Sequence, residues 1–79
     1  MRRKIPAMSS KKLVKLVKST GAYFVRHGKG DQDIYEKMAG GQRRAAPIQM
    51  GKQELRPEYS LMVFRQLGMT DEEIEEVLL

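Results

Sequence analysis

The feature that most constrains the fold is a glycine-rich bend between two short runs of strand-forming residues, from Ala22 to Tyr35. Residues 22–27 are rich in aromatic and β-branched side chains, and residues 32–38 form the second run. Between them, the sequence HGKG (residues 27–30) supplies the small residues of a tight turn. The pattern predicts a β-hairpin. Its turn brings backbone N–H groups, a Lys, an Arg and a His together, which suits a phosphate.

The residues before the hairpin predict an amphipathic helix over residues 10–20. Ser9 or Ser10 is a suitable N-cap, and Gly21 can adopt the left-handed conformation that ends a helix. Apolar side chains recur at helical spacing on one side, and lysines occupy much of the rest. We expect this helix to pack its apolar stripe on the sheet.

The residues after the hairpin predict a third strand and two further helices. The strand covers residues 42–48, and Pro47 should lie at a sheet edge or a strand end because proline cannot donate to a ladder. Pro57 favours the first turn of a helix whose apolar stripe is Leu61, Phe64 and Leu67. Residues 70–73 form a capping box for a short last helix. The order α-β-β-β-α, plus this helix, predicts an α+β fold with a three-stranded antiparallel sheet and helices on one face.

Size and composition exclude several classes of function. A chain of 79 residues is one domain. A domain of this size has no room for a deep cavity, so a polymer substrate fits better than a small metabolite. The sequence has no Cys, and no metal-ligand spacing or nucleotide-cofactor motif, so we expect no cofactor. No run approaches the about 20 apolar residues that span a bilayer. We therefore expect a cytoplasmic protein without a membrane partner.

The charge is unevenly distributed along the chain. Five of the ten acidic residues lie at positions 71–76, so residues 1–70 hold 15 basic and 5 acidic residues, a net charge of +10. A small body with this excess attracts polyanions such as RNA. The acidic end could fold back on the basic body as a shield.

The hairpin resembles the active-site hairpin of the HicA-type mRNA interferase toxins. Its sequence GKGD (residues 28–31) and the pair Ile34-Tyr35 match the family pattern. Pro47, residues 52–57 and residues 64–68 are similar to later parts of the family. The resemblance covers residues 8–69, after an irregular, flexible arm (1–7) and before an acidic C-terminal helix (70–79).

The resemblance implies a fold like that of double-stranded-RNA-binding domains and a metal-independent endoribonuclease. Such a toxin cleaves mRNA and is neutralised by a HicB-type antitoxin protein. Gln32 stands where the family carries its catalytic His. An amide can mimic the polarity of imidazole but cannot shuttle a proton. The resemblance therefore implies a catalytically disabled form, either natural or engineered, although an ordinary polar strand residue is the alternative.

The other candidate site residues are basic residues, the single His, a glycine and Tyr35 of the hairpin. His27 could substitute as a base, but a lone His gives no base–acid pair, so a polar turn residue that binds phosphate or water is preferred. Tyr35 is expected to pack rather than stack on a base. The candidates for contacts with RNA phosphates are Arg26, His27, Lys29, Gly30, Arg44 and Lys52, with Arg43 as a further choice.

Three functional hypotheses follow. The first is an endoribonuclease toxin of a toxin–antitoxin system, which binds RNA and a HicB-type antitoxin. The second is a non-catalytic RNA-binding module on the same basic face, which needs only charge and shape. The third is a DNA-binding or adaptor domain that uses the helix of residues 10–20.

Overall fold

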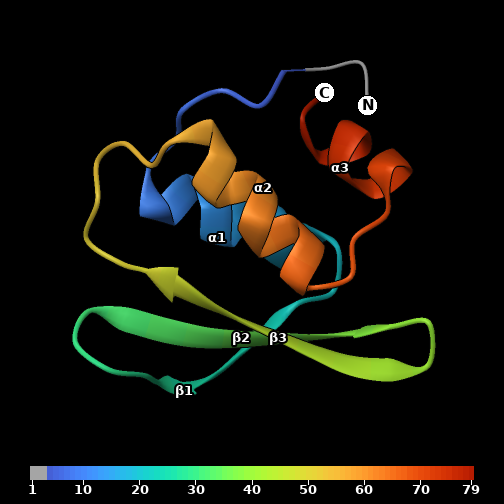
Figure 1. Ribbon diagram of the computed structural model, residues 1–79, viewed down its shortest axis with the longest axis horizontal. Helices are drawn as coiled ribbons and strands as arrows, with labels where there is room; N and C mark the ends of the chain where they lie inside the picture. Colours follow the sequence, from blue (N-terminus) through green and yellow to red (C-terminus); the bar gives the residue numbers. More distant parts are fainter. Residues whose placement is uncertain (1–3) are drawn as a thin grey trace.

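The computed structural model describes residues 4–79 and confirms the predicted α+β class. Three strands form an antiparallel sheet in the order β1-β2-β3, and α1 and α2 lie together on one face of it (Figure 1). The predicted strands agree with the observed ones to within one residue at each end. The elements are α1 (Ser10–Ser19), β1 (Tyr23–His27), β2 (Gln32–Ala39), β3 (Gln42–Gln49), α2 (Pro57–Gln66) and α3 (Asp71–Val77).

Helix α1 begins and ends where its sequence predicts. The Ser9 hydroxyl accepts a hydrogen bond from the Lys12 N–H at 3.1 Å, which satisfies one of the free donors of the first turn. At the other end, Gly21 has a φ of +103°, a conformation that favours glycine. The apolar residues of α1 are buried, whereas its four lysines are exposed. This amphipathic division directs the helix onto the sheet.

The core lies between the two helices and the inner face of the sheet. Tyr35 of β2 and Ile48 of β3 are buried there against Phe64 of α2. The buried stripe of α2 differs from the predicted one. Ser60, Val63, Phe64 and Leu67 are buried, whereas Leu61 is only partly buried. The residues that face the core follow the spacing i, i+3, i+4, i+7 from Ser60. Because Ser60 is polar, a search for apolar residues at helical spacing did not include it.

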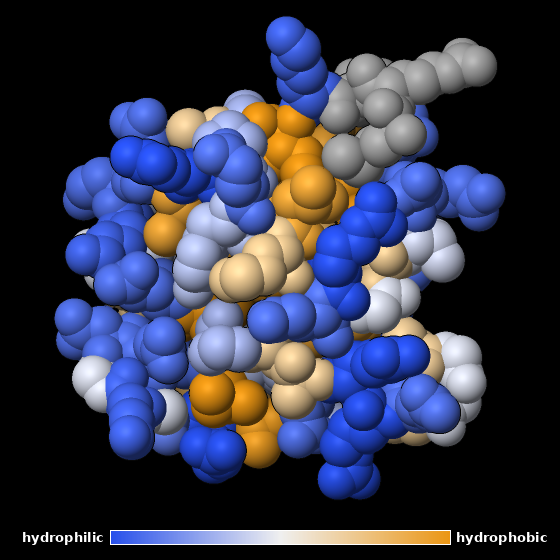
Figure 2. Space-filling view, in the orientation of Figure 1, coloured by the Kyte–Doolittle hydropathy of each residue, from blue (hydrophilic) through white to orange (hydrophobic). Residues whose placement is uncertain are grey.

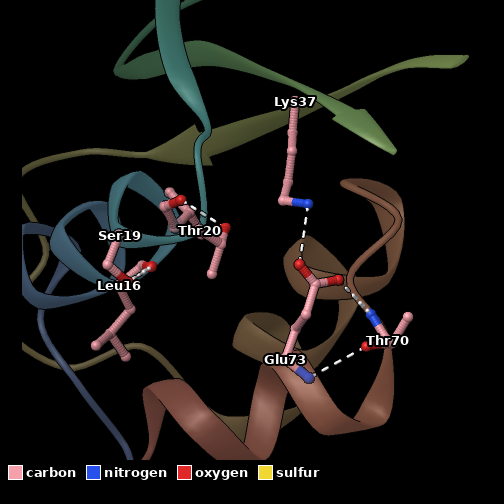
Figure 3. A network of polar contacts seen from close by, with 7 residues as sticks. Leu16, Ser19, Thr20, Lys37, Thr70 and Glu73 are labelled. Carbon is pink, nitrogen blue, oxygen red and sulfur yellow. Dashed lines mark hydrogen bonds and ion pairs between the residues drawn. The ribbon is translucent and has the colours of Figure 1, made fainter. Parts of the chain in front are cut away.

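Helix α3 is held to the rest of the chain by a capping box and an ion pair. The Thr70 hydroxyl accepts from the Glu73 N–H, and the Glu73 carboxylate accepts from the Thr70 N–H, as predicted. Lys37 extends from β2 to the same carboxylate, with its Nζ 3.2 Å from Oε2 (Figure 3). The acidic helix therefore contacts the basic body, but it does so away from the β1–β2 turn (Figure 1).

The outer surface is mainly hydrophilic in the view of Figure 2, with apolar residues visible in the upper part and in a smaller group near the lower edge. Residues 4–7 of the predicted arm have no regular secondary structure, although Ile5 is buried in the core. Residues 1–3 of that arm lie outside the described residues. Met8 forms an isolated bridge with Leu55, which fixes the entry into α1. None of the helices in residues 4–79 is long and apolar enough to cross a membrane.

Candidate functional site

A β-bulge in β1 determines which side chains of the hairpin lie together. Phe24 pairs with Tyr35, and the next paired residue of β1 is Arg26, opposite Ile34, so Val25 is an extra residue in the strand. Side chains alternate between the two faces of a strand, and one extra residue reverses that alternation. Arg26 therefore shares the outer face with Ile34. His27, one residue later, falls on the inner face.

The β1–β2 turn is closed by backbone hydrogen bonds. The Gly28 N–H donates to the carbonyl of Gln32 at 2.7 Å, and the Gln32 N–H donates to the carbonyl of Lys29 at 3.1 Å. Gly30 has a φ of +58°, a conformation that glycine adopts without steric cost. The Met50 N–H donates to the carbonyl of Asp31 at 2.8 Å. This last bond holds the loop after β3 against the turn.

A buried serine fixes the same loop from the other side. The Ser10 hydroxyl donates to the carbonyl of Gln49 at 2.6 Å and accepts from the Lys52 N–H at 3.0 Å. The Ser10 N–H in turn donates to the carbonyl of Lys52 at 3.0 Å. The start of α1 therefore positions Lys52 beside the hairpin. The Tyr59 hydroxyl accepts from the Gln49 N–H at 2.8 Å and steadies the end of β3.

These contacts create an open pocket of about 470 Å³ where the hairpin turn meets the loop. His27, Gly30, Asp31 and Asp33 line it from the hairpin, and residues 50–52 line it from the loop. A second hollow shares residues 50–52 and continues to the start of α1 at Ser9 and Lys11. The two hollows together form a track along one end of the molecule. An extended chain molecule fits such a track better than a compact ligand does.

The structure separates the predicted site residues into several places. His27, Gly30 and Lys52 line the pocket together, and Lys29 is exposed at the turn beside it. Gln32 is partly buried on the outer face of the sheet, where it pairs with Gln49 of β3. Arg26 lies on the same outer face. Gln32 and Tyr35 lie on opposite faces of β2, as the alternation of side chains along a strand requires.

The two other candidate arginines, Arg43 and Arg44, lie toward the other end of the sheet. Arg44 pairs with Lys37 across β2 and β3 and approaches Gly68, so the structure does not bring it to the turn. Arg43 forms an ion pair with Glu36, with 3.6 Å between Nε and Oε1.

Within residues 4–79, Arg26, Lys29 and Lys52 have no ion-pair partner. Their charges are thus available to an anion at this end of the molecule.

Two site residues were missed by the sequence analysis. Asp33 accepts from the His27 ring, with 2.7 Å between Nδ1 and Oδ1. No signal in the sequence located the bulge that brings Asp33 to His27. Phe24 lies beside the same ring, with a centroid distance of 5.3 Å in an edge-to-face arrangement.

Tyr35 packs in the core as predicted. It is buried, and its ring contacts Phe24 edge-to-face at 5.8 Å. Burial raises the pKa of the Tyr35 hydroxyl, and the nearby Asp33 carboxylate raises it further. The phenol therefore remains neutral at physiological pH and contributes packing rather than charge.

The side chains at this site suit proton transfer and anion binding rather than metal binding. Within the described chain, no cluster of three or more His, Asp and Glu residues could hold a metal ion. The site presents an imidazole, two carboxylates and Lys52, which has no ion-pair partner in residues 4–79, around one open pocket. No protein-family model matches the sequence, and no curated protein or solved structure matches the chain.

Proposed function

We propose that this chain binds single-stranded RNA at the β1–β2 turn and is a HicA-type mRNA interferase toxin in which Gln32 replaces the usual proton-transferring His. The observation that carries the proposal is the track beside the turn. It combines Lys52, the glycine bend and an exposed imidazole in one open hollow of about 470 Å³. Bacterial toxins of this kind act in the cytoplasm, and the partner would be a HicB-type antitoxin that covers the basic surface.

The lysines along the track support a phosphate backbone as ligand. Lys52 lies between the two hollows, and Lys11 lines the second one. Lys29 stands exposed at the turn without an ion-pair partner in residues 4–79. Each phosphate neutralised by a lysine releases counterions, so RNA affinity would fall with rising salt. Single-stranded RNA also offers unstacked bases, which the exposed ring of Phe24 beside His27 could contact.

RNA binding can be tested by charge removal. Lys52→Ala should weaken binding of a single-stranded oligoribonucleotide and reduce the salt slope by about 0.7, the value for one lost phosphate contact. Lys18→Ala, which removes an exposed lysine at the far end of α1, is the matched control and should change neither. Equal effects of the two substitutions would argue against a localised site.

The toxin proposal is tested by restoring the proton carrier. Gln32→His, expressed in bacteria without an antitoxin, should arrest growth and degrade mRNA. The control is Gln49→His, which places an imidazole on the neighbouring strand directly opposite position 32. Unchanged growth and intact mRNA at good expression of Gln32→His would contradict the toxin proposal.

A non-catalytic RNA-binding module is the second candidate. It is favoured by one observation: the amide of Gln32 has no group that titrates near neutral pH. On this reading, the lysine variants behave as above, but Gln32→His binds RNA without cutting it.

A further inference from the structure

A His–Asp pair stands at the mouth of the pocket, on the face opposite Gln32. His27 and Asp33 are register partners on adjacent strands, and the bulge at Val25 turns both side chains to the same face. The His27 Nδ1 lies 2.7 Å from the Asp33 Oδ1. The His27 side chain is 82% exposed, whereas the Asp33 side chain is only 17% exposed. The carboxylate is thus recessed in the protein, and the imidazole projects into the solvent at the pocket.

This geometry fixes where the imidazole carries its proton. An ionised carboxylate can only accept hydrogen bonds, so the hydrogen between the two residues belongs to Nδ1. The neutral ring then presents its lone pair on Nε2, the exposed nitrogen. The edge-to-face contact with Phe24 further restricts the ring. A base oriented by a carboxylate through its other nitrogen is an arrangement that active sites use to prepare proton transfer.

We propose that His27 is the general base for RNA cleavage in this chain and that Asp33 is its positioning residue. This inference rests on the proposed binding of RNA to the same pocket. The Nε2 atom takes the proton from a 2′-hydroxyl, and the 2′ oxygen forms a bond to the adjacent phosphorus. The bond from phosphorus to the 5′ oxygen breaks, and the leaving oxygen takes a proton from water. The products are a 2′,3′-cyclic phosphate and a 5′-hydroxyl, and no metal ion or redox partner is needed.

Lys52 completes the arrangement because it lines the same pocket as His27. The negative charge on the phosphate oxygens increases as the 2′ oxygen attacks, and a fixed cation stabilises that charge. Asp31 and Asp33 also line the pocket, and their carboxylates repel an unneutralised phosphate. One base with a single lysine, opposed by two carboxylates, is a weaker site than a complete base–acid pair. We therefore expect slow cleavage.

The competing interpretation is that His27 and Asp33 form only a surface contact between two strands. Such exposed pairs contribute little to stability and have no catalytic consequence. The two interpretations agree on folding and on RNA affinity. They differ in cleavage, in the identity of the product ends, and in how kcat and KM respond to Asp33.

The test measures cleavage of a 5′-labelled oligoribonucleotide in EDTA by identically purified full-length variants. The unsubstituted chain should cleave slowly and leave 2′,3′-cyclic phosphate ends. His27→Ala should reduce cleavage to background even at RNA concentrations that saturate the variant, since general-base catalysis contributes about 10²–10⁴ in rate. Asp33→Asn should lower kcat at least tenfold while KM falls, because a charge that repels the phosphate is removed. Asp33→Glu, which keeps the carboxylate, should recover part of the loss in kcat. Thermal unfolding of each variant checks the fold.

The outcomes separate this inference from the proposed function through Gln32→His and the double variant Gln32→His/His27→Ala. If only the chains with Gln32→His cleave, the toxin proposal stands and the role of His27 is refuted. If the unsubstituted chain and His27→Ala cleave equally, His27 is likewise not the base. If RNA binds but no variant cleaves, both the toxin proposal and this inference fail and the binding module remains. The proposal is supported if the unsubstituted chain cleaves RNA and His27→Ala does not.

Discussion

The junction between α2 and α3 depends on a glycine that contacts the sheet. Gly68 has a φ of +73°, and a Cβ atom at this position would lie 2.7 Å from the Cβ of Ala39 and 3.1 Å from the Cγ of Arg44. The first distance is shorter than any normal contact, and it involves a side chain with no freedom to move away. Gly68→Ala should therefore destabilise the protein in two ways, through the backbone and through the collision.

The two contributions can be given magnitudes. A left-handed conformation costs an L-residue about 1–2 kcal/mol, and overfilling a packed site typically costs about 1–3 kcal/mol. Gly68→Ala should thus lower the free energy of unfolding by about 2–5 kcal/mol. Small domains have about 0.05–0.15 kcal/mol of stability per residue, so this loss is a large fraction of the total. Gly40→Ala is the matched control, because Gly40 has a φ of +60° and no atom within 4 Å of the added Cβ.

Urea unfolding followed by circular dichroism measures these differences, with the midpoint shift taken at constant m-value. Gly40→Ala should show only the backbone cost. In a double-mutant cycle, Ala39→Gly should recover the steric part of the Gly68→Ala loss and leave its backbone part. Equal losses for Gly68→Ala and Gly40→Ala, or no coupling between positions 39 and 68, would refute the packing of this junction.

Further predictions concern buried polar groups and pH. Ser10→Ala should cost about 1–3 kcal/mol because it leaves the Gln49 carbonyl and the Lys52 N–H without their partner. Ser60→Ala should be neutral or stabilising, since the Ser60 hydroxyl is buried with no hydrogen-bond partner in residues 4–79; urea midpoints that fall by the same amount for both serines would contradict this. The pKa of Glu73 is lowered, first by the Thr70 N–H and then by Lys37, so its contribution to stability is complete above pH 4.5 and is lost as the pH falls through the lowered value. Glu73→Gln should therefore reduce the acid dependence of unfolding below pH 4.5, and an unchanged dependence would exclude this carboxylate as the cause.

The local signals in the sequence predicted the elements well because they act over a few residues. Ser9, Pro57 and the box of Thr70 and Glu73 determine helix starts by direct contact with the next turn. The edge position of Pro47 follows from its missing N–H, and β3 is indeed an edge strand. The phase of α2 was less predictable, because Ser60 occupies a buried position that an apolar pattern assigns to hydrophobic residues.

The composition of the pocket was less predictable still, because it depends on contacts between distant segments. Lys52 comes to the hairpin through hydrogen bonds from Ser10 and from the Met50 N–H, which join three separate parts of the chain. Their charge alone made Lys52 and Arg44 equal candidates for contacts with RNA phosphates. The register of β2 and β3 places Arg44 at the opposite end of the sheet from the turn.

The bulge at Val25 is the step on which the chemistry of the site depends. In an unbroken β1, strict alternation from Phe24 would place His27 on the outer face with Gln32, and Asp33 would have no imidazole beside it. The extra residue reverses the alternation, so His27 instead meets Asp33 at 2.7 Å on the inner face, where Lys52 also reaches. A single inserted residue thus places Gln32 and the only imidazole of the chain on opposite faces of the hairpin. Position 32 and position 27 can therefore be tested as two independent sites for proton transfer.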